Sequence, residues 1–405
     1  MQCFLFKVYF MMWRLILCFV FLVFIQFSCS DTKSSAPVEE VLSEAVSNDS
    51  INKILKKIHA TEKAKSLAAL FKQKSKKGRF NGCVLIAQQG QVIYESSSGY
   101  SNIKSKELLS LNSAFQLAST SKTFTAAAIL KLKDEGKLKV TDTLQKYFPS
   151  FPYKNITIHD LLTHRSGLGN YLYFGEPLCD QGNCYRGTIL NNANLLNMML
   201  NERPATYFVP ARKFAYCNTN YALLALIVEQ VSGLSFPDYM EKEVFEPLGM
   251  HNTWVHTAAN DAKHKNKTVG HTSSGKLEES DYGDEVLGDK GIYSTVSDLL
   301  IWDQSLYTEK LLKKETLEEA FTGYSNEHKG KRNYGYGWRI IDNGKGNKAI
   351  YHNGWWHGYN AVFFRRPADR TTVIILSNRD NHSLYQIQDI LEILDPHIYT
   401  ENVEE

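Results

Sequence analysis

Ser119 and Lys122 place a hydroxyl and an amine three residues apart, which is the spacing of neighbours on one helix face. A serine hydroxyl needs an adjacent base to attack a carbonyl, and a desolvated lysine can supply one. The Ser-X-X-Lys pattern occurs five times, beginning at Ser30, Ser50, Ser101, Ser119 and Ser273. Only the copy at Ser119 opens a helix-length apolar segment, so we predict a nucleophile at the first turn of a buried helix.

Two later stretches carry polar groups that a reaction at a carbonyl would need. Tyr216 and Asn218 precede a very apolar helical segment, and an extended backbone would point the phenol and the amide the same way. A phenol can act as a base if a nearby ammonium stabilises its anion. The triple His352-Asn353-Gly354 lies in a predicted hairpin, where a strand glycine often marks a close approach by a ligand or another backbone. The three stretches together supply the groups for acyl transfer through a serine ester.

Each stretch also has a purely structural interpretation when it is taken alone. A Ser-X-X-Lys pair is usually a solvated surface pair, and Tyr216 could be one packing aromatic among 22 tyrosines. A single histidine such as His352 is more often a hydrogen-bonded structural residue than part of a reactive site. The ordered combination of all three stretches is what favours a reactive site.

In this order, the motifs resemble those of the serine β-lactamase and penicillin-binding protein superfamily, from about Phe80 to Ile393. The chain looks most similar to the branch of class C β-lactamases, D-alanyl-D-alanine carboxypeptidases and related esterases. Five further landmarks fit the same pattern: residues 140–144, 158–168, 245–250, 288–295 and 334–338.

The resemblance implies a role for each motif residue. Ser119 would be the nucleophile, Lys122 its proton partner, and Tyr216 the base for acylation and the acid toward the leaving group. The backbone N–H groups of Ser119 and Trp355 would form the oxyanion hole, each contributing about 3 kcal/mol of transition-state stabilisation. The residues expected to contact the substrate are Asn218, His352, Asn353 and Gly354. No cofactor and no metal is implied.

Two positions depart from the pattern of many β-lactamases. Their third motif is Lys-Thr/Ser-Gly, whereas this chain has His352-Asn353-Gly354. The missing hydroxyl removes a donor for a substrate carboxylate, and histidine, which titrates at about pH 6.5, lacks the fixed charge of lysine. We therefore expect a peptidase or esterase rather than a dedicated β-lactamase. The second departure is Cys217, which we interpret as a packing difference, although a thiol between two site residues could be oxidised.

Composition and the missing motifs exclude several other classes. The 405 residues carry a net charge of +3 with no basic stripe, which gives no argument for nucleic-acid binding. The sequence contains no His-Glu-X-X-His, no Gly-X-Ser-X-Gly and no phosphate loop, which argues against a zincin, an α/β-hydrolase and a nucleotide-binding protein. No second cysteine and histidine cluster has metal-ligand spacing.

The N-terminus predicts export. An arginine precedes the apolar run 15–25, which is too short for a comfortable membrane span. The run ends in a small residue followed by Cys29, which resembles a bacterial lipoprotein signal. Cys29 would then be acylated and become the mature N-terminus of an envelope protein facing the periplasm or the surface. Ordinary cleavage and an uncleaved anchor are the alternatives.

We divide the chain into an export signal at 1–28, a tether at 29–60, a hydrolase domain at 61–398 and a tail at 399–405. The domain should be of the α/β class in its α+β form, with an antiparallel sheet flanked by helices and a mainly helical lobe. Cys179 and Cys184 lie in a polar loop, where export makes a disulfide plausible and two free thiols are the alternative. Candidates for an aromatic rim are Tyr171, Tyr173, Phe174, Trp356 and Tyr359.

The function expected from these features is that of an exported serine hydrolase that forms an acyl-enzyme on Ser119. Its substrates would be peptide, ester or β-lactam carbonyls. The alternative is a non-catalytic envelope protein that binds peptidoglycan fragments or a protein partner in the same cleft. An inactive relative would usually have lost Ser119, Lys122 or Tyr216, and all three are present.

Overall fold

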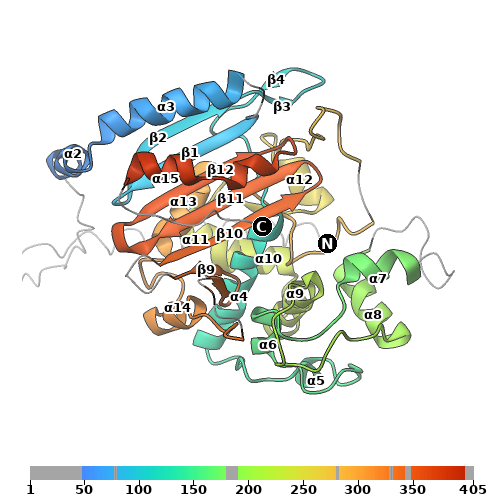
Figure 1. The fold of residues 1–405 in the computed structure, drawn as a ribbon. Helices are drawn as coiled ribbons and strands as arrows, with labels where there is room; N and C mark the ends of the chain where they lie inside the picture. Colours follow the sequence, from blue (N-terminus) through green and yellow to red (C-terminus); the bar gives the residue numbers. More distant parts are fainter. Residues whose placement is uncertain are drawn as a thin grey trace, which may run out of the picture. The chain divides into compact units, whose positions relative to one another are not determined.

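Seven strands of the computed structural model pair into one antiparallel sheet, in the order β2-β1-β12-β11-β10-β9-β8 (Figure 1). The strands are β1 (Gly82–Gln88), β2 (Gln91–Ser98), β8 (Arg332–Tyr334), β9 (Arg339–Ile341), β10 (Ala349–Trp356), β11 (Tyr359–Arg366) and β12 (Thr371–Ser377). The structure describes residues 48–76, 78, 80–178, 190–279, 282–327, 330, 332–342 and 348–396. These described residues belong to one compact unit that begins at Asn48.

Both faces of the sheet are buried, because its strands alternate between two apolar cores. In β1, Val84 and Ile86 face a core shared with Leu67 and Phe71 of α3 (Ala60–Lys76). The same core is closed by α15 (Gln388–Leu394), and α2 (Asn48–Lys57) packs beside α3. Figure 1 shows α3 and α15 lying along this face.

The other face of the sheet packs on a mainly helical lobe. Here Phe124 of α4 (Ser121–Asp134) stacks on Trp302 of α13 (Val296–Ser305) with ring centroids 4.4 Å apart. The remaining helices of the lobe and its edge are α5 (Leu144–Tyr147), α6 (Ile158–Leu162), α7 (Tyr171–Leu178), α8 (Asn192–Glu202), α9 (Asn218–Ser232), α10 (Phe236–Met240), α11 (Glu246–Leu248), α12 (Ala258–Lys263) and α14 (Lys314–Ala320). The short strands are β3 (Tyr100–Asn102), β4 (Glu107–Leu108), β5 (Phe115–Gln116), β6 (Trp254–Val255) and β7 (Ile292–Ser294). The α+β architecture expected from the sequence is therefore confirmed.

Several sequence predictions fall outside the residues that the structure describes. The export signal, Cys29, the pair Cys179 and Cys184, and the tail at 399–405 are among them. Helix α2 occupies the last part of the 29–60 range that we assigned to a tether. Within the described ranges, no helix is long and apolar enough to cross a membrane.

Candidate active site

Ser119 lies in a tight turn that leads directly into α4. The turn is the 3₁₀ helix η1 (Ala118–Thr120), and Ala118 takes a φ of 46°. A positive φ is unusual for a residue with a side chain, and such strain is common beside reactive groups. The turn is tied to the sheet, because Thr120 Oγ1 donates to the carbonyl of His352 at 3.0 Å. Ser119 is thus held between α4 and β10, two residues before the regular α-helix begins, whereas we predicted it in the first turn of that helix.

Lys122 connects the candidate nucleophile to the opposite wall of the site. Its side chain is fully buried, and Nζ donates to Ser119 Oγ at 3.0 Å and to the carbonyl oxygen of Asp289 at 2.7 Å. The i, i+3 spacing across the junction of η1 and α4 brings the amine to the hydroxyl, the contact that the sequence predicted. The carbonyl of Asp289 holds the amine from a segment 167 residues further along the chain.

Tyr216 faces the same amine from the loop before α9. Lys122 Nζ lies 5.0 Å from the centre of the Tyr216 ring, and the guanidinium of Arg339 lies 5.3 Å from it. Cations over an aromatic face are stabilised by the ring quadrupole. The phenol oxygen is buried and, among the described residues, has no hydrogen-bond partner. Its part in proton transfer stays a prediction.

Asn218 is the first residue of α9, and the extended backbone of Cys217 turns it toward the same cavity as Tyr216. Its amide oxygen is also buried and lacks a partner within the described part of the chain. Cys217 points away from the cavity into the protein. Its thiol lies 3.5 Å from the carbonyls of Leu168 and Gly169, and burial raises its pKa to about 11. A thiol held in this protonated state reacts slowly with oxidants, so the packing interpretation fits it.

Gly354 is required where β10 crosses η1, the turn that contains Ser119. A Cβ at this position would lie 2.1 Å from the carbonyl oxygen of Leu117 and 3.0 Å from the amide nitrogen of Ser119. Only glycine lets the two backbones approach so closely. The approach puts the next residue, Trp355, on the cavity wall together with Ser119. Ser119 and Trp355, which come from different elements, thus line one cavity, and the oxyanion hole formed by their backbone N–H groups stays a prediction.

His352 and Asn353 lie behind the cavity wall, not on it. Both side chains are fully buried, and neither they nor Gly354 line the cavity. The imidazole Nδ1 lies 2.7 Å from the carbonyl of Asn353 and Nε2 lies 3.1 Å from the hydroxyl of Tyr334. Burial, with the charges of Arg339 and Lys122, holds the pKa of His352 well below its usual range. A neutral, fully bonded imidazole supports the wall, so direct contact of His352 with substrate stays a prediction.

The cavity has a volume of about 390 Å³, and Ser119, Tyr216 and Asn218 lie in its lining. Sequence reasoning missed three of its charged residues: Asp289, Lys290 and Arg339. Arg339 is the first residue of the short strand β9, and its Nε has no partner among the described residues. No motif marked it, because a lone arginine after a Gly-Trp pair looks like any surface position. It supplies the cavity with a cation that the histidine motif lacks.

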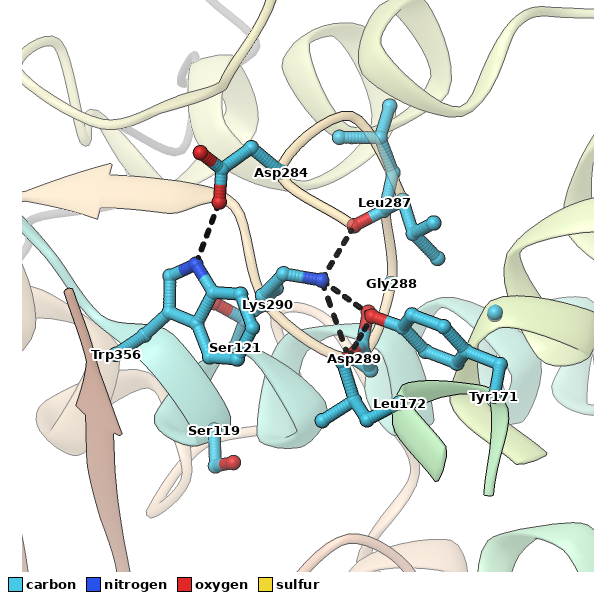
Figure 2. A network of polar contacts seen from close by, with 12 residues as sticks. Ser119, Ser121, Tyr171, Leu172, Asp284, Leu287, Gly288, Asp289, Lys290 and Trp356 are labelled. Atoms are coloured by element: carbon cyan, nitrogen blue, oxygen red, sulfur yellow. Dashed lines mark hydrogen bonds and ion pairs between the residues drawn. The ribbon is translucent and has the colours of Figure 1, made fainter. Parts of the chain in front are cut away.

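Asp289 and Lys290 form a buried network with Tyr171 beside the nucleophile (Figure 2). Lys290 Nζ donates to the Tyr171 hydroxyl, which donates to the Asp289 carboxylate at 3.0 Å. Burial lowers the pKa of Lys290, and burial with the neighbouring Asp289 raises the pKa of Tyr171. The network fixes Asp289, whose main-chain carbonyl holds Lys122. The landmark at 288–295 signalled the segment but not these contacts.

The predicted aromatic rim is present only in part. Tyr173 and Trp356 line the cavity, and Trp355 joins them with 44% of its surface exposed. Tyr171 and Tyr359 are buried, and Phe174 packs against the core. The rim thus comes from the start of α7 and the end of β10.

Comparison with known proteins agrees with this geometry. The Beta-lactamase family model matches residues 67–395. The chain is 34% identical over 341 residues to penicillin-binding protein 4* of Bacillus subtilis (strain 168), which covers 80% of this chain and 74% of that protein. The octameric penicillin-binding protein homologue from Pyrococcus abyssi superposes with a TM-score of 0.68 at 28% identity, over 78% of this chain and 73% of that one. A class C β-lactamase shares the fold, with a TM-score of 0.69 at 18% identity over 85% and 98% of the two chains. With the Ser119, Lys122 and Tyr216 arrangement in one cavity, these matches show that the chain belongs to the serine β-lactamase and penicillin-binding protein superfamily, a family of serine hydrolases.

Proposed function

We propose that this protein hydrolyses carbonyl substrates through an acyl-enzyme on Ser119. The observation that carries the proposal is the position of Lys122 Nζ, 3.0 Å from Ser119 Oγ and 5.0 Å from the Tyr216 ring centre, in a cavity of about 390 Å³. This is the arrangement of a nucleophile, a cation and a proton acceptor within reach of one another that covalent catalysis needs.

The first half of the reaction forms the ester. Ser119 Oγ attacks the carbonyl carbon while its proton passes to the Tyr216 phenolate, whose charge the Lys122 ammonium balances. The carbonyl oxygen becomes an oxyanion and accepts hydrogen bonds from the N–H groups of Ser119 and Trp355. The bond to the leaving group then breaks, and the leaving group takes the proton from Tyr216. In the second half, water gives a proton to Tyr216 and attacks the ester carbonyl. The bond from Ser119 Oγ to the carbonyl carbon then breaks, Ser119 Oγ takes the proton back from Tyr216, and the acid is released.

The position of Arg339 favours a substrate that carries a carboxylate near the leaving group. The guanidinium lines the cavity and lies 5.3 Å from the ring of Tyr216, the residue that would protonate the leaving group. Arginine is always charged and matches the geometry of a carboxylate. The neutral His352 lacks that charge, so Arg339 would replace the lysine of the usual third motif. We favour a D-peptide carboxypeptidase or a related esterase over a dedicated β-lactamase.

A fluorescent fluorophosphonate and a fluorescent penicillin test both parts of this proposal on the purified protein. Each probe should form an adduct that mass spectrometry maps to Ser119. Since only penicillin carries a carboxylate, Arg339→Gln should slow labelling by penicillin about tenfold to a hundredfold, the size of a lost charged hydrogen bond. Labelling by the fluorophosphonate should change less than threefold. Arg212→Gln, an exposed arginine in the loop before Tyr216, is the matched control.

The outcomes separate the candidate functions. Fluorophosphonate labelling without penicillin labelling would indicate an esterase or peptidase without carboxylate recognition. Equal loss of both labels in Arg339→Gln would contradict the role of Arg339. No adduct from either probe on folded protein would refute the hydrolase and favour the envelope binding protein.

The N-terminal pattern supports export and attachment to the bacterial cell envelope. Lipid on Cys29 would tether the hydrolase domain to a membrane surface, where a peptidoglycan-derived substrate would be available. Cells expressing the full chain should incorporate labelled palmitate into the protein, and Cys29→Ala should abolish the label. Equal labelling of the variant would show that Cys29 is not the attachment site, and unlabelled wild-type protein would refute the lipid anchor.

A further inference from the structure

The helices α2 and α3 carry an excess of positive charge. Residues 48–76, which contain both helices, have eight lysines and two acidic residues and thus a net charge of +6. The whole chain has a net charge of +3, so its other residues together carry −3. The nearly balanced total hides this local excess, which matters only if the lysines share one surface.

On α3, three exposed lysines form a row that faces solvent. Lys65, Lys72 and Lys76 are seven and four residues apart, a spacing that places them on one side of an α-helix. Leu67 and Phe71, on the opposite side of the helix, are buried in the core between α3 and the sheet. The exposed residues between the first two lysines include two alanines, so no large side chain covers the row.

On α2, three further lysines are exposed in the same way. Lys53, Lys56 and Lys57 lie on one side of the helix, while Leu55 and Ile58 pack against the core that α3 also covers. Because both helices turn their apolar sides toward one core, their lysines point away from it. The six exposed lysines of α2 and α3 therefore form one surface, called the basic face below.

The acidic residues near α15 do not neutralise the basic face. The carboxylate of Asp389 lies 3.8 Å from Lys74 Nζ, and Asp395 interacts electrostatically with Lys63. Neither of these lysines belongs to the basic face, and both are less exposed than its members. Among the described residues, the side chains of the six lysines have no ion-pair or hydrogen-bond partner. Their charge is therefore available to an external anion.

The shape and composition of the basic face favour a membrane as that partner. Two neighbouring helices present their charges outward, which suits an extended anionic surface better than a small ion. Clusters of four to eight lysines or arginines beside a membrane attachment point are typical of segments that bind anionic lipids. The chain also supplies such a point in its sequence, because a lipid on Cys29 would hold α2 within roughly 70 Å of a bilayer, the extended length of the residues between them.

Docking through the basic face would leave the candidate active site open. Helix α3 packs on one face of the sheet, whereas Leu117, just before the nucleophile turn η1, and Phe124 of α4 belong to the core on the other face (Figure 1). A bilayer against α3 would thus lie across the sheet from Ser119. The cavity would remain accessible to a substrate outside the membrane.

We propose that the basic face docks this protein on an anionic phospholipid bilayer. A lipid on Cys29 would attach the chain to the membrane, and the basic face would decide which side of the domain meets it. The proposal goes beyond the proposed function, because it involves none of the groups around Ser119 and holds for any reaction in the cavity.

Flotation of the protein, purified as cells produce it from the full chain, with two kinds of vesicle tests the proposal. One kind contains phosphatidylcholine alone, and in the other phosphatidylglycerol replaces a third of the lipid. At low salt, partition into the anionic vesicles should be at least about thirtyfold stronger, because each lysine close to such a surface contributes about fivefold. High salt should bring the ratio below about threefold. A lipid on Cys29 contributes to both kinds of vesicle, so the ratio reports on the basic face.

The triple variant Lys65→Gln/Lys72→Gln/Lys76→Gln should lower this ratio about tenfold or more. The three positions are exposed, so the melting temperature should stay unchanged. Arginine at the same three positions keeps the charge and should keep the wild-type ratio.

A second triple variant, Lys139→Gln/Lys310→Gln/Lys314→Gln, is the matched control. It removes the same charge from exposed positions, and Lys314 begins α14, which packs on the core across the sheet from α3. This variant should keep the wild-type ratio within about threefold. A loss in the control as large as that in the α3 variant would overturn the assignment to the basic face.

The remaining outcomes are equally decisive. Equal partition of wild-type protein into both kinds of vesicle would overturn the proposal. Binding to immobilised polyphosphate without a preference for anionic vesicles would also overturn it and indicate a soluble polyanion as the partner. Labelling of Ser119 by a fluorophosphonate, measured on the same variants, should stay unchanged. A protein that prefers anionic vesicles but forms no adduct would keep the docking face and refute only the hydrolase.

Discussion

Ser119→Ala should lower turnover of any ester or peptide substrate by roughly four to six orders of magnitude, because removal of a catalytic nucleophile has that effect in other serine hydrolases. Fold stability should change by less than about 1 kcal/mol. The Ser119 hydroxyl makes one contact to Lys122, and that amine keeps its second bond to the carbonyl of Asp289. The expected result is thus a folded, inactive protein.

Steady-state rates and thermal unfolding, measured on the same preparations, check this expectation. The sequence offers a matched control in Ser273→Ala, because Ser273 begins another Ser-X-X-Lys copy on an exposed turn. This control should keep wild-type activity and should still react with a fluorophosphonate. If Ser119→Ala retained more than about one per cent of the wild-type kcat, the nucleophile would have to be sought elsewhere.

Tyr216→Phe should reduce kcat by about a hundredfold to ten-thousandfold, the usual contribution of a positioned acid or base. The phenylalanine ring keeps the contacts of the Tyr216 ring with Lys122, Arg339 and His164. Only the phenol oxygen is lost, and it is buried with no hydrogen-bond partner among the described residues. Removing an unpaired polar atom should leave the melting temperature unchanged or slightly raised. Activity should therefore fall without a loss of stability.

The leaving group supplies a sharper readout for Tyr216. An aryl ester releases a stable anion that needs no proton, so the variant should lose less activity on it than on an alkyl ester or a peptide. Tyr207→Phe, at a tyrosine with 58% of its surface exposed, is the control for the loss of a phenol. An equal loss on every leaving group would restrict Tyr216 to the activation of Ser119. Wild-type rates would exclude it from proton transfer.

Local spacing in the sequence was sufficient to predict the contact between Ser119 and Lys122 and the close backbone approach at Gly354. Ser119 and Lys122 are three residues apart, so the contact at 3.0 Å follows once the turn η1 runs on into α4. Gly354 likewise indicated the close approach between β10 and η1. Each prediction depends on helix or strand periodicity, which short stretches of sequence contain.

Contacts between distant segments were decided only by the tertiary structure. The carbonyl of Asp289 meets Lys122 across 167 residues, and nothing near either residue announces the contact. Arg339 lines the cavity because the three-residue strand β9 pairs with β10. His352 does not line it, because its ring is directed toward the hydroxyl of Tyr334. Trp356, the last residue of β10, lines two separate cavities, and no local sequence pattern indicates this. The sequence thus determined the reactive groups and the elements that carry them, while packing decided which charges surround them, since side-chain environments depend on neighbours that no local pattern encodes.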